Sequence, residues 1–314
     1  MCSQFTGNGP QASGNSLQSA PTDGVLVINK PSGPSSAQCL NKVKRALGIK
    51  KAGHAGTLDP MAEGVLLLLL GQATKLSSYL MGRKIYSGTI ELGRSTDTWD
   101  AEGQTIETKN IDNITQLQVK EAVEEWVYLK EQTVPPYSAA KHQGQALYKL
   151  SRQGKAVPQK IKQIEIFKAE LLDFTSPYLK FRVECSSGTY IRSLAHSLGI
   201  RLGTGATLTA LTREYSHPFT LEQAVSVTEA CEDPKGVLTR VADLPASLPD
   251  WHKTILSPDE AASVRNGVLV ICREPLSPGA RSLLLTECGA PLALAEVVID
   301  AGKNKFKVLR GLWQ

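Results

Sequence analysis

The stretch "GHAGTLDPMAEGVLLLLL" (residues 53–70) places a single carboxylate, Asp59, in a tight loop directly before six consecutive apolar residues. The apolar run at 65–70 is too short to be a core helix by itself, so it predicts a buried strand. An aspartate before a proline often only opens a turn, because its side chain bonds to the backbone two residues further along. Asp59 is therefore either a turn residue or a carboxylate with a chemical role, and the rest of the chain has to decide.

The composition is that of an ordinary globular protein, with 41% hydrophobic and 21% charged residues. The 314 residues are enough for one large domain and a smaller one. A formal net charge of +5 is mildly basic, which permits a nucleic-acid partner without requiring one.

The six cysteines lie at positions 2, 39, 185, 231, 272 and 288. They form no Cys-x-x-Cys pair and none has a histidine at zinc-ligand spacing, which argues against a structural zinc and a disulfide framework. A reducing cytoplasm fits this usage.

Residues 1–22 contain no Lys, Arg, Asp or Glu and predict a disordered tail. They lack the basic start and apolar run of a secretory signal. No apolar run approaches the roughly 20 residues of a membrane helix, so we expect no membrane association.

Hydrophobic periodicity predicts strands and helices that follow one another without a regular βαβ repeat. The expected strands cover 24–33, 65–70, 83–93 and 178–185, and the expected helices cover 35–48, 73–81, 115–127 and 186–203. Ser35 with Gln38, and Thr115 with Gln118, have capping-box spacing. This order indicates an α+β fold around a central, largely antiparallel mixed sheet flanked by helices and loops.

A proline-rich joint, "LPASLPDWH" (244–252), separates two regions of different pattern. Beyond it, residues 250–314 contain short apolar pieces between Gly and Pro, which predict a small β-rich domain. The expected organisation is a tail at 1–22, a large domain at 23–245 and a small domain at 250–314.

Residues 132–164 form a basic arm that contains several lysines and an arginine but no acid. Its cations include Lys141, Lys149, Arg152 and Lys155, and aromatic rings are interleaved with them. A solvated loop is one interpretation, but a run of one charge sign that carries rings is more typical of an arm that contacts nucleic-acid phosphates.

Asp59 has several possible roles. It has no second carboxylate or histidine cluster at metal-ligand spacing, and Asp97 and Asp100 are interpreted as loop and turn acids. A glycosidase pair cannot be located from sequence. A third possibility is a nucleophile or base held by Arg192 as a bidentate cation and covered by the ring of Tyr86.

Several separated blocks together resemble the TruB family of tRNA pseudouridine-55 synthases. They are "GVLVINKPSG", "KKAGHAGTLDPMAEGVLLLLLGQATKL", "KIYSGTIELGRSTDTWDAEG", "VPPYSAAKHQGQALYKLSRQG" and "SSGTYIRSLAHSLGIRLGTGATLTALTRE". The resemblance covers roughly residues 24–215, in the family's order and spacing. The remaining tail resembles, more loosely, a small RNA-binding domain of the PUA type. The resemblance implies the pseudouridine-synthase fold.

The resemblance implies a role for each matching residue. Asp59 corresponds to the nucleophile that acts on the target uridine, and Arg192 to the arginine paired with it. Tyr86 corresponds to the tyrosine that stacks on the flipped base and takes the C5 proton.

Four further positions match the family's substrate-binding residues. Tyr190 and Leu211 correspond to walls of the pocket. His54 corresponds to a histidine that fills the space left in the RNA loop when bases flip out, and Lys30 belongs to a motif that supports the site.

The implied activity is isomerisation of uridine 55 in the T loop of tRNA, by base flipping and attack by a single aspartate. The reaction needs no cofactor, metal or guide RNA, and we expect a cytoplasmic monomer. Two alternatives stay open: a tRNA-binding or tRNA-folding protein whose catalysis is secondary or lost, and a related synthase that acts on another RNA site or with a guide.

Overall fold

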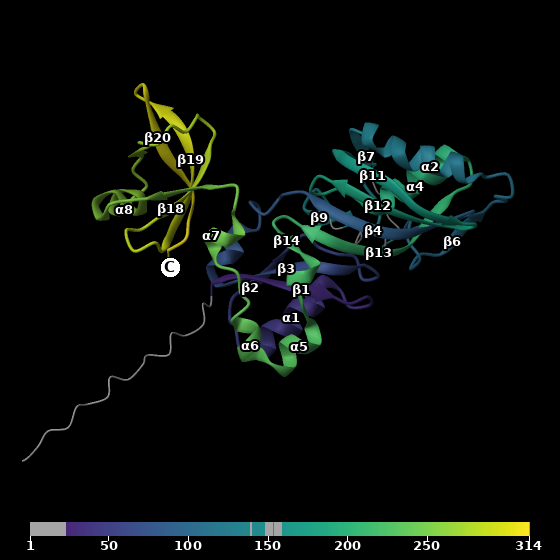
Figure 1. The fold of residues 1–314 in the computed structure, drawn as a ribbon, viewed down its shortest axis with the longest axis horizontal. Coiled ribbons are helices and arrows are strands. Elements are labelled where there is room, and N and C mark those ends of the chain that lie inside the picture. Colours follow the sequence, from purple (N-terminus) through teal and green to yellow (C-terminus); the bar gives the residue numbers. More distant parts are fainter. Residues whose placement is uncertain (1–22, 139, 148–152, 154–158, 314) are drawn as a thin grey trace, which may run out of the picture.

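The computed structural model describes residues 23–138, 140–147, 153 and 159–313 (Figure 1). A large sheet with its helices forms one part of the described chain, and the C-terminal segment forms a second, smaller sheet (Figure 1). The tail expected at 1–22 lies outside the described residues.

The large sheet joins strands in the order β11-β12-β4-β13-β3-β1-β15, with β2 paired to β3 and β14 paired to β13. Only the β1–β15 and β3–β13 pairs are parallel within this sheet as described, so the expected largely antiparallel mixed sheet is confirmed. Its strands are β1 (Gly24–Lys30), β2 (Ala52–Ala55), β3 (Glu63–Leu70), β4 (Lys84–Leu92), β11 (Ile166–Thr175), β12 (Tyr178–Cys185), β13 (Ala206–Ser216), β14 (Phe219–Thr220) and β15 (Val225–Ser226).

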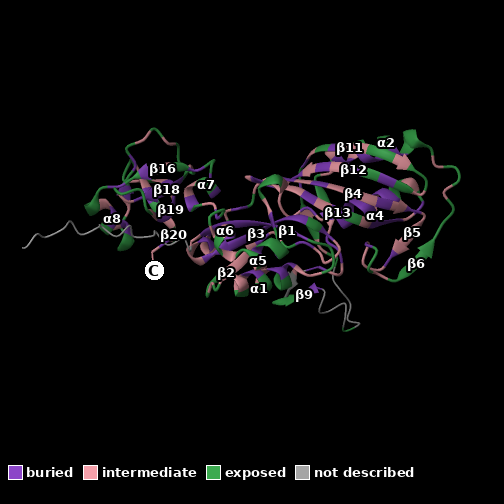
Figure 2. Cartoon of the chain, turned by 60° about the horizontal axis from the view of Figure 1, so that its bottom comes forward, coloured by how far each residue is buried: buried purple, intermediate pink, exposed green. Residues whose placement is uncertain are grey.

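The unbroken apolar run of β3 has a physical reason, because β3 is buried on both faces. Leu66, Leu68 and Leu70 belong to the core cluster beneath the helices, whereas Leu67 and Leu69 belong to a second cluster on the opposite face. A strand covered on both faces needs apolar residues at every position rather than alternation. Figure 2 shows β1 and β3 as largely buried strands within the molecule.

Five α-helices of the described chain supply one side of this core: α1 (Ser36–Ala46), α2 (Gln116–Glu124), α4 (Ile191–Leu202), α5 (Val227–Glu232) and α6 (Pro234–Leu238). The helix α7 (Leu244–Ser247) contributes to the cluster on the opposite face, and α8 (Pro258–Arg265) packs within the C-terminal segment. Both expected capping boxes are present, at Ser35 and Gln38 of α1 and at Thr115 and Gln118 of α2. The strand alternation expected for β12 is also confirmed, since its inward side chains are all buried.

The region expected to be a helix at 73–81 is a shorter 3₁₀ helix, η1 (Gly71–Leu76). Further short elements are η2 (Glu125–Tyr128), η3 (Leu221–Gln223) and the two-stranded pairs β5 (Arg94–Thr96) with β6 (Thr105–Thr108), β7 (Glu131–Thr133) with β10 (Ile161–Gln163), and β8 (Lys141–His142) with β9 (Gln145–Ala146). The basic arm is therefore not a plain loop where it is described, because it contains β8, β9 and β10 and most of β7.

The C-terminal sheet joins strands in the order β16-β18-β19-β20-β17, which confirms the expected β-rich segment. They are β16 (His252–Ile255), β17 (Val270–Ile271), β18 (Arg281–Leu285), β19 (Pro291–Asp300) and β20 (Lys303–Gly311). Its residues Trp251, Leu283 and Leu312 share an apolar cluster with Val65 and Leu67 of the large sheet. This cluster covers the face of β1 and β3 opposite the helices. None of the described helices is long and apolar enough to cross a membrane.

Gly64, at the start of β3, lies where the backbone of β13 approaches closely. Its φ angle is +96°, and an added Cβ would lie 2.3 Å from the carbonyl oxygen of Arg213 on the parallel strand β13. A side chain here would meet backbone, which cannot swing aside. Glycine is therefore required where β3 leaves the Asp59 loop.

Gly64→Ala should lower the free energy of unfolding by about 3 kcal/mol, because it adds a positive-φ cost of about 1–2 kcal/mol and an overpacking cost of about 1–3 kcal/mol. Urea unfolding followed by circular dichroism would measure the loss. The matched control is Gly302→Ala, at a φ of +74° with no atom within 4 Å of an added Cβ. Equal losses in the two variants would show that the approach to Arg213 is unimportant.

Candidate active site

The Asp59 loop is fastened at both ends by side chains that bond to its backbone. The ammonium of Lys30, which is fully buried, donates to the carbonyl oxygens of Pro31 and Pro60 at 2.9 Å and of Ala62 at 2.6 Å. Ser36 Oγ accepts from the amide of Leu58 at 2.9 Å and donates to its carbonyl at 3.0 Å. These contacts hold the loop from β1 and α1, so Asp59 occupies a fixed place.

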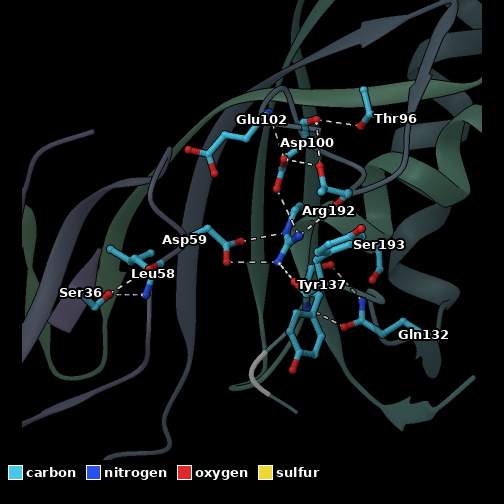
Figure 3. A network of polar contacts seen from close by, with 12 residues as sticks. Ser36, Leu58, Asp59, Thr96, Asp100, Glu102, Gln132, Tyr137, Arg192 and Ser193 are labelled. Carbon is cyan, nitrogen blue, oxygen red and sulfur yellow. Dashed lines mark hydrogen bonds and ion pairs between the residues drawn. The ribbon is translucent and has the colours of Figure 1, made fainter. Parts of the chain in front are cut away.

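Asp59 and Arg192 form a two-point ion pair across 133 residues of chain (Figure 3). Nη2 of Arg192 donates to Oδ1 at 3.1 Å, and Nε lies 2.9 Å from Oδ2. Their exposures differ greatly, since the Arg192 side chain is 5% exposed and the Asp59 side chain 37%. The guanidinium thus lies inside the protein while the carboxylate reaches the opening.

Asp100 is a second carboxylate on the same guanidinium, which the sequence interpretation missed. Its Oδ2 lies 3.2 Å from Nη1 of Arg192, and its Oδ1 accepts from Thr98 Oγ1 at 2.6 Å and from the amide of Glu102 at 3.1 Å. Burial raises the pKa of Asp100, and the Arg192 guanidinium and the Thr98 hydroxyl oppose this shift. The interpretation of Asp100 as an ordinary turn acid is therefore wrong, because its charge is buried against Arg192.

The remaining donors of Arg192 bond to backbone. Nη1 donates to the carbonyl of Thr98 and Nη2 to the carbonyl of Tyr137, each at 3.0 Å. Between Thr98 and Asp100, Trp99 adopts a φ of 65° and stacks on His196, one turn beyond Arg192 in α4, with the ring centroids 4.2 Å apart. This stacking holds the segment against the helix that carries the guanidinium.

The start of α4 is fixed by Gln132, at the centre of β7. Its Oε1 accepts from the amide of Tyr190 at 2.6 Å, and its Nε2 donates to the carbonyl of the same residue at 3.2 Å. Tyr190 is the residue before the helix, so this clamp sets the direction of α4 and the place of Arg192.

A cavity of about 380 Å³ opens beside the ion pair. Its lining includes Asp59, Arg192, Tyr86, Tyr190 and Leu211, five of the residues named from the sequence. Burial raises the pKa of the phenols of Tyr86 and Tyr190, so both stay neutral in neutral solution. The cavity therefore combines a carboxylate, a buried cation, two neutral phenols and an apolar wall.

The other expected residues lie elsewhere. Lys30 supports the Asp59 loop from below, as described above. His54 lies in β2 outside the lining of the cavity, and burial lowers its imidazole pKa. Lys149, Arg152 and Lys155 are outside the described residues, and the Lys141 side chain is not described.

The sequence interpretation did not identify two cationic residues of the site. Lys84 lines the cavity, and Arg213 lies fully buried behind it. Lys84 precedes Tyr86 by two positions in a strand, so period-two alternation could have placed both on the same face. Arg213 bears the same relation to Leu211 in β13.

The chemistry available is that of a fixed carboxylate beside a cavity large enough for a small molecule or a flipped base. Within the described chain, no group of three or more His, Cys, Asp or Glu residues could hold a metal ion. The arrangement suits nucleophilic catalysis by one carboxylate whose charge is balanced by a bidentate arginine.

Comparison with known proteins gives consistent matches. Residues 44–191 match the model of the TruB family pseudouridylate synthase N-terminal domain. The chain is 54% identical over 298 residues to a tRNA pseudouridine synthase B of Oleidesulfovibrio alaskensis, covering 92% of this chain and 96% of that relative. It is 41% identical over 301 residues to the corresponding protein of Syntrophotalea carbinolica, covering 92% of this chain and 97% of that one.

Solved structures show the same fold at lower identity. An archaeal box H/ACA sRNP Nop10-Cbf5 complex matches with a TM-score of 0.68 and 21% identity, covering 93% of this chain and 86% of that one. A Cbf5-Nop10-Gar1 complex matches with a TM-score of 0.69 and 22% identity, covering 93% of this chain and 85% of that one. At this identity the likeness concerns the fold alone.

The ion pairs of Arg192 with Asp59 and Asp100, which we call the Arg192 bridge, lead to a stability prediction. Arg192→Met should lower the free energy of unfolding at pH 7 by about 3–5 kcal/mol, because it leaves the buried carboxylate of Asp100 unpaired. Adding Asp100→Asn should recover about 1–2 kcal/mol of that loss, since the two residues are in contact. Urea unfolding of the two single variants and the double variant would measure this coupling.

The loss of unfolding free energy in Arg192→Met should be smaller at pH 5 than at pH 7. Arg192 lowers the pKa of Asp100, so its removal raises that pKa further above the value in the unfolded chain. The folded state then binds the proton more readily, and acid relieves the unpaired charge. Arg201→Met breaks an exposed pair with Glu125 and should change stability by less than about 1 kcal/mol. A loss independent of pH would contradict the burial of an unpaired carboxylate.

Proposed function

Because the chain belongs to the TruB family of pseudouridylate synthases, we propose that it isomerises uridine to pseudouridine at position 55 in the T loop of tRNA. The observation that carries the proposal is the Asp59–Arg192 pair at a cavity also lined by Tyr86. Relatives that are 54% identical over nearly the whole chain are named tRNA pseudouridine synthase B. The enzyme is thus an intramolecular transferase.

The target uridine has to leave the RNA stack before it can react. Base flipping costs a few kcal/mol, which contacts in the protein cavity must offset. The cavity beside Asp59 is partly open, and its mixed polar and apolar lining suits a uracil base together with its ribose. We assign the phenol ring of Tyr86 to stack on that base and its oxygen to take the C5 proton while the hydroxyl gives up its own proton, and N1 gains a proton in exchange.

Asp59 is assigned as the nucleophile that holds the nucleotide while the base turns. The reaction breaks the bond from C1′ to N1 and forms a bond from C1′ to C5, without any change of redox state. The guanidinium of Arg192 fixes both oxygens of the carboxylate, so one lone pair can point into the cavity. Tyr190 and Leu211 are assigned to the walls beside the base.

Two further residues support the RNA complex in this proposal. Lys30 holds the Asp59 loop through two of its backbone carbonyls, those of Pro60 and Ala62. His54, on the strand that leads into that loop, is assigned to fill the space that the flipped base leaves in the RNA.

RNA backbone contacts are assigned to the basic arm, through Lys141, Lys149, Arg152 and Lys155. We propose residues 250–314 as a small PUA-like RNA-binding domain, and residues 23–245 as the catalytic domain. The enzyme acts as a monomer in the cytoplasm, without a metal, a cofactor or a guide RNA. The named tRNA enzymes that it resembles over most of their length support tRNA as the substrate.

Asp59→Asn should abolish pseudouridine formation while leaving tRNA affinity nearly unchanged. The substitution removes the nucleophile and keeps the shape, and phosphate contacts supply most of the affinity. Tritium release from tRNA labelled with [5-³H]uridine measures the reaction, and mapping of the modified base identifies the position. Filter binding measures the affinity.

Asp112→Asn, on an exposed loop, is the matched control and should keep full activity. A large loss of affinity in Asp59→Asn would contradict the assignment of a catalytic role. Absence of release by the wild-type protein, with tight tRNA binding retained, would favour the tRNA-folding alternative.

Charge reversal in the basic arm should weaken the binding of RNA to a similar extent whatever the RNA sequence is. Lys149→Glu with Arg152→Glu should lower tRNA affinity and reduce the slope of log K against log salt by about 1 to 2, because each phosphate contact contributes roughly 0.7 to 0.9 to that slope. Lys120→Glu, on an exposed face of α2, serves as the control. An unchanged salt slope would remove the arm from the RNA interface.

A further inference from the structure

Lys84 is a buried cation in the cavity for which the proposed reaction has no assigned use. It is the first residue of β4, and only 7% of the residue is exposed. It lines the cavity together with Asp59 and Tyr86. Among the described residues its ammonium has neither a hydrogen-bond partner nor a carboxylate within 4.0 Å, so it faces the cavity unpaired.

Arg213 places a second cation beside it. Its guanidinium is fully buried, with Nε donating to the carbonyl of Val65 and Nη2 to the carbonyl of Gly56, each at 2.7 Å. Its Nη1 is buried and has no hydrogen-bond partner in the part of the chain that the structure describes. The point where a Cβ on Gly56 would stand is 3.0 Å from Lys84 Nζ and 3.2 Å from Arg213 Nη1.

Two neighbouring cations without an anion are an unfavourable arrangement for a folded protein. Burying a charge is costly unless it is paired, and like charges repel more strongly where water is excluded. Burial, and after it the adjacent Arg213, lower the pKa of Lys84 to about 8. Such a cost is typical of a functional site, where an incoming ligand completes the pairing.

We propose that Lys84 is a further catalytic residue, whose ammonium contacts a carbonyl oxygen of the uracil base and stabilises the negative charge that the base acquires during the reaction. Arg213 acts behind it as a positioning residue, because its side chain does not line the cavity. This inference rests on the proposed pseudouridine synthesis and names the group that meets the base.

The charge on the base follows from the bonds that change. When the bond from C1′ to N1 breaks, its electron pair stays on uracil and is shared among N1, O2 and O4. If Asp59 instead attacks C6 first, the C5–C6 electron pair moves toward C5 and O4. Either route places negative charge on O4 until C5 bonds to C1′ and loses its proton. A preorganised cation at that oxygen lowers the barrier in both cases.

The depth of Lys84 favours the base over a backbone phosphate. The Asp59 side chain is 37% exposed and lies toward the mouth, whereas Lys84 is almost completely buried. A flipped nucleotide inserts its base into the pocket, so the phosphates remain toward the opening. Lys84 therefore meets a base oxygen rather than the RNA backbone.

The charged and titratable groups that face Lys84 come from three other strands. They are Arg213 on β13, Cys185 on β12 and Lys162 on β10. Burial raises the pKa of the Cys185 thiol to about 11, and it also raises the pKa of the Tyr86 phenol on β4. The Lys84 ammonium, whose pKa is about 8, therefore changes charge at a lower pH than either the Cys185 thiol or the Tyr86 phenol.

Lys84→Met tests the proposal through the separation of rate from affinity. The single-turnover rate of tritium release at saturating enzyme should fall by about 10²–10³-fold, the usual effect of losing one oxyanion-type donor. The dissociation constant for tRNA should stay within about twofold, since no phosphate contact is lost. Lys180→Met, on the exposed side of β12, is the matched control and should change neither quantity.

The pH profile gives a second readout that a purely structural role would not produce. The wild-type rate should fall as pH rises through about 8, because only the protonated ammonium stabilises the charge. Lys84→Arg keeps a permanent cation, so it should exceed Lys84→Met at least tenfold in rate and lack this fall. Should Lys84→Met fail to fold by circular dichroism, the profile of Lys84→Arg decides alone.

Three results would overturn the proposal. A raised dissociation constant with a reduced salt slope and an unchanged rate would identify a phosphate contact. Unchanged rate and affinity in Lys84→Met, or a wild-type fall near pH 8 that persists in Lys84→Arg, would remove Lys84 from the chemistry. Wild-type protein that forms no pseudouridine would instead refute the proposed function itself, so the two failures are distinguishable.

Discussion

The guanidinium of Arg192 is the group on which the cavity depends, because it joins parts of the chain that lie far apart in the sequence. It contacts Asp59 after β2, Asp100 before β6 and the carbonyl of Tyr137 in the basic arm, while α4 carries it. Three of these segments are loops. One buried cation with two carboxylates and two carbonyls therefore helps to set the positions of these loops relative to α4.

The position of this bridge follows from the two-sided burial of β1 and β3. The helices pack on one face of these strands, and the C-terminal sheet contributes to the cluster on the other. A strand covered on both faces is rigid, because it can move only together with the whole core. The loop at the start of β3 is therefore rigid where it joins the strand. Lys30 transmits this rigidity to the Asp59 loop through the carbonyl groups of Pro60 and Ala62, which follow Asp59. The packing of the core therefore also fixes the geometry of the site.

Local patterns in the sequence predicted most of the sheet and helices. They could not predict contacts between residues that are distant in the sequence. The capping boxes of α1 and α2 and the alternation in β12 depend on neighbouring residues, so they could be predicted. Asp100 was misread because its Asx-like bonds to Thr98 and Glu102 are those of any turn acid. Only the approach of α4, 92 residues later, gives its carboxylate a buried partner.

The distribution of charge in the cavity matches a reaction that separates charge within one nucleotide. Asp59, near the mouth, is already engaged by Arg192 and does not pair with Lys84 at the inner end. Detachment of a base leaves the sugar electron-poor and the base electron-rich. In the proposed complex, the carboxylate would lie toward the sugar and the cation toward the base, where each would oppose a developing charge, and burial would strengthen each interaction. Pairing Lys84 with a carboxylate would stabilise the fold but would cancel this field, which gives a physical reason for a lysine that the protein leaves unpaired.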